Sequence, residues 1–342
     1  MTVWWWLLLA AVAAVSLLLT GALRRYALAT QMMDIPNARS SHSVPTPRGG
    51  GVAIVVSFLL CLPLCAALGL LDRDTAIALT GSGIGVAILG FLDDRQHIPA
   101  RWRLLGHFSA AIWILFWIGG LQTVRLFGVE LQLGWVGLVL TALYLVWMLN
   151  LYNFMDGIDG IASVQAITTC IGGALLLVIA GHAQTALIPL LLGGAVAGFL
   201  YWNFPPARIF MGDAGSGFLG LMLGALSLVS GSIDPELFWA WLILLGVFVV
   251  DATFTLLRRL LRGDRVYEAH RSHAYQYASR HFGRHLPVTL AVGTINLLWL
   301  LPLALLAGQG WADGAFVTLI AYAPLLALAL RFHAGKAETQ HI

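Results

Sequence analysis

The chain has 342 residues, of which 59% are hydrophobic and 10% are charged, and its formal net charge is +3. Soluble domains are about 45–50% apolar and about 25% charged, so this composition excludes a disordered chain and argues against a soluble enzyme. The small net charge also excludes a nucleic-acid binder that uses a broad basic face. We therefore expect an integral membrane protein with several helices that span the lipid bilayer.

About eleven stretches are apolar and long enough to cross a membrane, which takes about 20 residues each. They cover approximately residues 3–23, 51–71, 75–92, 104–120, 134–152, 161–181, 184–202, 214–231, 237–257, 286–307 and 314–331. Arg24 and Arg25 follow the first stretch and no small-residue cleavage site ends it, so we expect a retained helix and not a signal peptide. The sequence predicts an all-α polytopic membrane protein, with residues 1–342 forming a single transmembrane domain.

The positive charges predict the orientation of these helices. Of the 19 Lys and Arg residues, all but Arg73 and Arg125 lie in the loops after odd-numbered helices or in the C-terminal tail. Lys and Arg are enriched in short cytoplasmic loops, so we expect the N-terminus outside and the C-terminus in the cytoplasm. The same side carries most of the polar motifs. We therefore expect an active site at the cytoplasmic face, built from the loops at residues 24–50, 93–103, 150–160, 203–215 and 258–285.

The first two cytoplasmic loops combine arginines with acids. Arg48 follows two prolines and precedes a run of glycines, which permits close backbone approach; it is either a charge in a structured connector or a donor to a phosphorylated head group. Asp93 and Asp94 end the third helix, where adjacent carboxylates repel and Mg²⁺ or a shared proton would relieve the cost. We expect one of them to face a site and the other to orient it or cap the next helix. Arg101 and Arg103 are candidate phosphate ligands or interface anchors.

Two further loops carry groups suited to a cation. Asn150, Asn153, Asp156 and Asp159 recur every three residues, so in a helical turn they drift slowly across one face. Polar groups of this kind at the end of an apolar span are costly unless they bind something. Mg²⁺ prefers oxygen ligands of this kind. Asp213 lies between glycines directly before a helix, whose free N–H groups can bind an anion while the carboxylate holds a cation. Together these two motifs favour a magnesium site.

The longest loop is rich in Arg and His and contains the compact group His270, Arg271 and His273. No cysteine or carboxylate spacing favours zinc there, and Arg beside His suits a diphosphate. The alternative is a polybasic segment that lies on anionic lipid.

Asp251 is the acid placed well inside a span, and it suggests the main rival function. An intramembrane acid is a functional candidate by default, although Asp251 can also pair with Arg258 or Arg259. Secondary transporters place binding sites near the midplane and often contain internal repeats. Here the other acids gather at one face and no repeat is found, so a transporter is the alternative. A CDP-alcohol phosphatidyltransferase or a non-catalytic scaffold fits less well, because the acidic motifs are spread over separate loops.

Together these motifs resemble the polyprenyl-phosphate N-acetylhexosamine-1-phosphate transferases. The resemblance runs through all five cytoplasmic loops and rests on the Asp93–Asp94 pair, the N-x-x-N-x-x-D-G-x-D-G run from Asn150, and F-M-G-D from Phe210. It implies transfer of a sugar-1-phosphate from a UDP-N-acetylhexosamine to undecaprenyl phosphate, with release of UMP. It also implies Mg²⁺, with Mn²⁺ as an alternative ion, in the bacterial inner membrane.

The resemblance implies a role for each motif. The implied metal ligands are Asn153 and Asp213. The residues implied at the acceptor phosphate, one of them as base, are Asp93 and Asp94, and those bordering the nucleotide and metal are Asp156 and Asp159. The implied substrate-binding residues are Asn150, His270, Arg271, His273, Arg48, Arg101 and Arg103.

Two differences from the muramoyl-pentapeptide branch of this family indicate which branch the chain resembles. The muramoyl-pentapeptide branch usually has Met at the position of Arg48 and a run of histidines in the last loop, where this chain has His-Arg-Ser-His. The chain looks more like bacterial enzymes that start O-antigen or related polysaccharides from GlcNAc, QuiNAc or FucNAc donors. His97 replaces the third acid of the D-D-x-x-D form found in some relatives. The sequence does not determine the oligomeric state, and a homodimer is one option.

Overall fold

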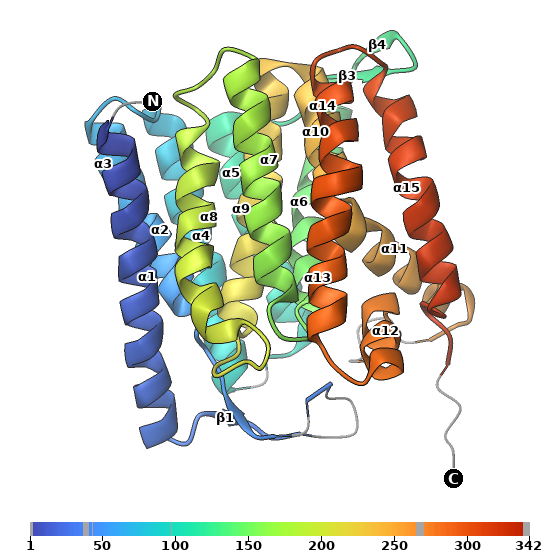
Figure 1. Ribbon diagram of the computed structural model, residues 1–342. Helices are drawn as coiled ribbons and strands as arrows, with labels where there is room; N and C mark the ends of the chain where they lie inside the picture. The colour runs from blue at the N-terminus through green and yellow to red at the C-terminus, as the bar shows by residue number, and fades with distance from the viewer. Residues whose placement is uncertain (1–2, 37–40, 43, 97, 265–269, 338–342) are drawn as a thin grey trace.

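Long helices lying side by side make up most of the molecule (Figure 1). This computed structural model describes residues 3–36, 41–42, 44–96, 98–264 and 270–337, so His97 lies outside the described residues. In chain order the helices are α1 (Val3–Ala29), α2 (Val52–Leu59), α3 (Cys61–Ala67), α4 (Arg73–Arg95), α5 (Ala100–Ile118), α6 (Gly134–Met155), α7 (Ile161–Ile179), α8 (Leu187–Asn203), α9 (Asp213–Ile233), α10 (Pro235–Leu244), α11 (Gly246–Leu261), α12 (Ala274–Phe282), α13 (Leu286–Ile295), the π-helical turn η1 (Asn296–Leu300), α14 (Leu301–Gly308) and α15 (Gly314–Arg331).

The helices are those of a polytopic membrane protein. Among the described residues, seven helices are long and apolar enough to cross a membrane, and the bent pair α10–α11 would make an eighth. Each predicted stretch falls on a helix or a pair of helices, but the count of eleven and the side of each terminus stay predictions. The start of α1 and the end of α15 lie at opposite ends of the molecule (Figure 1).

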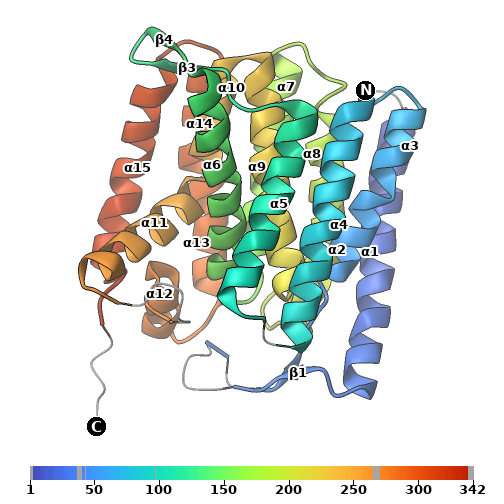
Figure 2. The same cartoon turned by 180° about the vertical axis from the view of Figure 1, so that it is seen from behind.

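Two short antiparallel sheets depart from the all-α prediction. β1 (Met33–Asp34) pairs with β2 (Thr46–Pro47), and β3 (Thr123–Leu126) pairs with β4 (Val129–Gln132). Positive φ angles in the turn between β3 and β4 are typical of a two-residue hairpin, which can form from local sequence alone. The β3–β4 hairpin and β1 lie at opposite ends of the helices (Figure 2).

Helix α9 is buried over most of its length and packs against α4 and α6. A Cβ at Gly220 of α9 would lie 2.4 Å from the carbonyl oxygen of Met148 in α6. Small residues that allow such close approach are what packs helices in lipid, because lipid supplies no hydrophobic driving force between them. The N-terminus of α9, which carries Asp213, is therefore held in place by its neighbours.

The predicted span at residues 237–257 is not one straight helix. The chain bends by 73° between α10 and α11, so that α11 is inclined to the other long helices (Figure 1). At the break, the carbonyl of Leu244 accepts a hydrogen bond from Nε2 of Gln165 at 2.9 Å. Asn296 Nδ2 in turn donates to Gln165 Oε1 at 3.0 Å. Buried polar side chains of this kind satisfy a backbone that bends at membrane depth.

Candidate active site

The glycine run after Arg48 packs against the start of α9. The backbone N–H of Gly51 donates to the carbonyl of Met211 at 2.8 Å, and a Cβ on Gly51 would lie 2.5 Å from the Cα of Gly215. A residue with a side chain does not fit there, as expected from the role of glycine in close backbone contacts. The contact brings Arg48 to Asp213.

Arg48 bridges two of the predicted site carboxylates. Its Nη2 lies 2.7 Å from Oδ1 of Asp94 and 2.6 Å from Oδ1 of Asp213. The backbone N–H of Asp213 donates to Asp94 Oδ1 at 3.1 Å, and that of Ala214 donates to the other oxygen at 3.5 Å. Asp94 therefore binds the N-terminus of α9, where the helix dipole favours negative charge. Its side chain is 1% exposed, so Asp94 can affect the site only by positioning Arg48 and Asp213.

Asp93 has different partners from its neighbour in sequence. Arg103 Nη1 donates to Asp93 Oδ2 at 2.7 Å, and the backbone N–H of Ile98 donates to Oδ1 at 2.7 Å. Through these bonds Asp93, near the end of α4, is linked to Arg103 of α5. Arg103, a predicted phosphate ligand, is therefore already paired with a carboxylate. Arg101 lies over the ring of Trp102 at 5.8 Å. Adjacent residues on a helix point in different directions, which is why the two carboxylates serve different contacts.

Two cavities share Asn153 and Asp213 in their linings. The first, which we call the central cavity, has a volume of about 360 Å³ and is also lined by Arg48, Asp156 and Asp159. The second, the side cavity, has about 180 Å³; the other predicted site residues in its lining are Asp93, Arg103 and Asn150. Asp94 lines neither of them. The second, third and fourth motifs thus surround one region at the ends of α4, α6 and α9.

The third motif does not continue as a helix to its end. α6 stops at Met155, Asp156 follows as its C-cap, and Gly160 has a left-handed φ of 73° before α7. Asn153 therefore stands on the last helical turn, whereas Asp156 and Asp159 lie in a turn. This corrects the expectation of four polar groups drifting across one helical face, and glycines explain the change because they favour the turn.

The two asparagines of the motif have different neighbours. Asn153 Nδ2 donates to Ser216 Oγ of α9 at 2.9 Å, which leaves its amide oxygen as an acceptor. Asn150 Nδ2 donates to the carbonyl of Val146 at 2.7 Å and lies 3.3 Å from Nδ1 of His107. Asn153, unlike Asn150, is therefore bonded to the first turn of α9, the helix that begins at Asp213.

Asp159 is anchored by His285, which the sequence reasoning did not single out. His285 Nδ1 lies 3.1 Å from Asp159 Oδ1, and its Nε2 lies 3.0 Å from the Ser41 carbonyl. Burial disfavours the protonated ring, but the hydrogen bond and charge of Asp159 outweigh burial, so the pKa of His285 lies above its ordinary value. In the sequence, the feature that could have marked His285 as a site residue is its position at the end of the Arg- and His-rich loop.

Asp156 differs from the other predicted site carboxylates in its hydrogen bonding. Within the described part of the chain, no donor bonds its side chain. Burial raises the pKa of Asp156 well above its ordinary value; the negative charge of Asp213 adds to this effect and Arg48 opposes it. The carboxylates Asp94, Asp156 and Asp213 thus outnumber the cation Arg48, so the region attracts a further positive charge.

The donor set fits a hard divalent cation. Among the described residues, no group of three His, Cys, Asp or Glu could hold a metal ion by itself. Mg²⁺ does not need such a group, because it keeps waters and takes one or two carboxylates together with substrate phosphates. Asp213 and the amide oxygen of Asn153 border the same cavities, and both are oxygen donors. The oxygen donors of the site therefore fit Mg²⁺, whereas a zinc site typically uses a set of Cys or His ligands.

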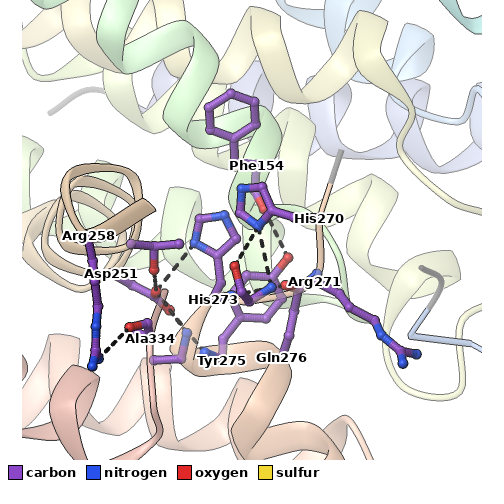
Figure 3. Close-up of polar contacts among 12 residues, drawn as sticks. Phe154, Asp251, Arg258, His270, Arg271, His273, Tyr275, Gln276 and Ala334 are labelled. Carbon is purple, nitrogen blue, oxygen red and sulfur yellow. Dashed lines mark hydrogen bonds and ion pairs between the residues drawn. The ribbon is translucent and has the colours of Figure 1, made fainter. Parts of the chain in front are cut away.

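The segment with His270, Arg271 and His273 lies beside the central cavity, and these described residues are not part of its lining. Gln276, three residues further on, does line the cavity. The ring centroids of the two histidines are 4.8 Å apart. Burial lowers the pKa of His270 to about 3, and the nearby His273 and Arg259 add to this effect. Figure 3 shows the side chain of Arg271 directed away from the histidines.

Known proteins are similar to this chain over much of its length. Residues 76–231, which hold the second, third and fourth motifs, match glycosyl transferase family 4. The chain is 31% identical over 265 residues to a probable undecaprenyl-phosphate N-acetylglucosaminyl 1-phosphate transferase of Bacillus subtilis, which covers 76% of this chain and 73% of the relative. It is 28% identical over 289 residues to an undecaprenyl-phosphate alpha-N-acetylglucosaminyl 1-phosphate transferase of Thermotoga maritima (84% and 87%). It is also 28% identical over 265 residues to a phospho-N-acetylmuramoyl-pentapeptide-transferase of Streptococcus pneumoniae (71% and 77%). The chain therefore belongs to the polyprenyl-phosphate N-acetylhexosamine-1-phosphate transferase family.

Proposed function

We propose that this protein transfers an N-acetylhexosamine-1-phosphate from a UDP-sugar to undecaprenyl phosphate and releases UMP, as the first membrane step of O-antigen or related polysaccharide synthesis. The observation that carries this proposal is the meeting of Arg48, Asp156 and Asp213 around one polar cavity at the ends of apolar helices. Such a place serves a water-soluble donor and an acceptor whose isoprenoid chain stays in lipid. We place it at the cytoplasmic face of the bacterial inner membrane, where the positive loops are expected.

We propose UDP-GlcNAc, or a 6-deoxy relative that carries QuiNAc or FucNAc, as the donor. The names of the relatives from Bacillus subtilis and Thermotoga maritima support GlcNAc. The His-Arg-Ser-His segment at residues 270–273, in place of a histidine run, supports this branch over the muramoyl-pentapeptide branch.

Asn153 and Asp213 would hold Mg²⁺ in this proposal, with Mn²⁺ as an alternative ion. When bound, the ion neutralises charge on the donor diphosphate and on the departing UMP. Arg48 supplies N–H donors in a planar fork that suits phosphate oxygens. Asp94 positions both Arg48 and the N-terminus of α9 through the bonds described above.

The reaction forms a bond from an acceptor phosphate oxygen to the β-phosphorus of the donor and breaks the bond from that phosphorus to the bridging oxygen of UMP. Because the attacking group is already an anion, the site mainly has to orient the reactants and offset their charge. The oxygens of Asp93 and Asp94 are engaged by Arg103 and by α9, so we assign these residues positioning roles. A proton on the acceptor phosphate would pass to Asp156, the carboxylate that lines the cavity without a donor among the described residues.

The test is UMP release by the purified protein in detergent, with Mg²⁺, undecaprenyl phosphate and a panel of UDP-N-acetylhexosamines. We expect release that requires the metal, the lipid and one particular sugar. Asp234→Asn is a matched control, because Asp234 caps α10 through the backbone N–H of Glu236 and lies away from the cavities. Folded protein that releases no UMP with any donor would refute the proposal and favour the transporter alternative.

A further inference from the structure

Asp251 is a buried acid in an apolar helix, and its oxygens bind the start of another helix. Oδ1 accepts the backbone N–H of Ala274 at 2.9 Å, and Oδ2 accepts that of Tyr275 at 3.0 Å. Thr255 Oγ1 donates to Oδ1 at 3.1 Å. The first N–H groups of a helix have no partner within it and lie at the positive end of its dipole. Asp251 of α11 therefore holds the N-terminus of α12.

This arrangement differs from the pairing that the sequence suggested. Arg258 Nη1 donates to the carbonyl of Ala334 at 3.1 Å, and Arg259 Nε donates to Oδ2 of Asp264 at 3.3 Å. The neighbouring arginines thus serve other groups. The break between α10 and α11 tilts α11 (Figure 1), and Asp251 meets α12 instead of lining a path through the membrane.

The helix that Asp251 holds begins at the His-Arg-Ser-His motif. His273 is the N-cap of α12, and its Nδ1 lies 3.4 Å from Oδ1 of Asp251. The ring of His273 is roughly parallel to those of Phe154 and Tyr275, with centroids 6.4 and 5.7 Å away. Its side chain is nearly inaccessible. Asp251 and two aromatic rings therefore set the position of this histidine.

The same segment is tied to the end of α6 and to residues 332–336. The hydroxyl of Tyr275 donates to the carbonyl of Phe154 at 2.9 Å, next to the predicted metal ligand Asn153. The backbone N–H of Gly335 donates to the carbonyl of Ser272 at 2.7 Å. The segment before α12 is thus held from several sides, and Asp251 supplies the contact at the helix N-terminus.

We propose that Asp251 is a positioning residue for donor binding. It does not contact the substrate; it fixes the N-terminus of α12, so that Gln276 lines the central cavity and the His-Arg-Ser-His motif stays at its edge. This inference rests on the proposed function, because the ligand is the UDP-N-acetylhexosamine. A buried acid is costly in an apolar segment without partners, and here two backbone N–H groups and a hydroxyl offset that cost.

The test separates donor binding from turnover. Asp251→Asn keeps the side-chain shape, but the new amide nitrogen is itself a donor. It must face one of the backbone N–H groups from which the wild-type carboxylate accepts a hydrogen bond. We expect KM for the donor to rise roughly ten- to a hundredfold, the size expected for one lost charge-assisted hydrogen bond. kcat and KM for undecaprenyl phosphate should change less than about threefold. Thr255→Val removes one of the bonds to Asp251 and should raise the donor KM by about two- to fivefold.

Asp72→Asn is the matched control, because Asp72 caps α4 by accepting the N–H of Thr75 at 2.9 Å at the other end of the helices. It should leave every constant unchanged. A folded Asp251→Asn protein with the wild-type KM for the donor would overturn the inference. If that variant fails to fold, an unchanged donor KM in Thr255→Val would overturn it. Wild-type protein that neither binds nor turns over any UDP-N-acetylhexosamine, by calorimetry and UMP release, would overturn the proposed function as well.

Discussion

A methyl group added at Gly90 should displace the start of α9 and impair turnover. The Cβ of Gly90→Ala would lie 2.6 Å from the backbone nitrogen of Ala214 and 2.6 Å from the carbonyl carbon of Asp213. Ordinary contacts begin at 3.4 Å, and close-packed interiors do not absorb such overlap, so the two backbones must separate by about 0.8 Å. Because Arg48 lies 2.6 Å from Asp213, this shift also disturbs their ion pair.

The expected size follows from that displacement. A misplacement of about 1 Å at a reacting centre can cost about 10²-fold in rate, so we expect kcat/KM to fall by about 10- to 100-fold. Overpacking also costs about 1–3 kcal/mol in the free energy of unfolding. The measurements are UMP release and thermal unfolding in one detergent, with the proposed donor and acceptor.

Gly85 provides a matched control in the same helix. A Cβ there meets nothing within 4 Å, so Gly85→Ala should leave both turnover and the unfolding temperature close to those of the wild-type protein. Wild-type kcat/KM in Gly90→Ala would refute the reasoning. An equal loss in both variants would also refute it, because the effect would then come from α4 itself.

The other predictions concern charges in the same region. Asp213→Ala and Asn153→Ala should each abolish Mg²⁺-dependent UMP release, and normal turnover by either purified variant would remove the metal assignment. Arg48→Gln should reduce the free energy of unfolding by about 1–3 kcal/mol, below the 3–5 kcal/mol of a fully buried pair, because the Arg48 side chain is 34% exposed; an unchanged unfolding temperature would contradict this. The raised pKa of His285 means that its pairing with Asp159 stabilises the fold below the ordinary histidine pKa of about 6.5 and that this contribution is lost as pH rises through the raised value. The difference in unfolding temperature between wild type and His285→Asn should therefore shrink with rising pH, and a difference that grows would oppose the assignment.

Local chemistry in the sequence was enough to predict the membrane class, the positions of the long apolar helices and the acidic motifs, but not α12, which lies in the predicted loop at residues 258–285. A run of apolar residues reports its burial by composition alone. The glycines around Asp213 likewise mark a turn before a helix, because turn preference depends on adjacent residues. The resemblance to the transferase family used the same short motifs and agrees with the relatives found.

Only the tertiary structure decided which groups share a partner. Arg48 meets Asp213 across 165 positions, and the adjacent Asp93 and Asp94 serve different helices. The break in the span at residues 237–257 and the contact of Asp251 with α12 also had no local signal. Turn preference and hydrophobicity act over a few residues, whereas these pairings follow from how closely whole helices can pack, which depends on every small residue between them.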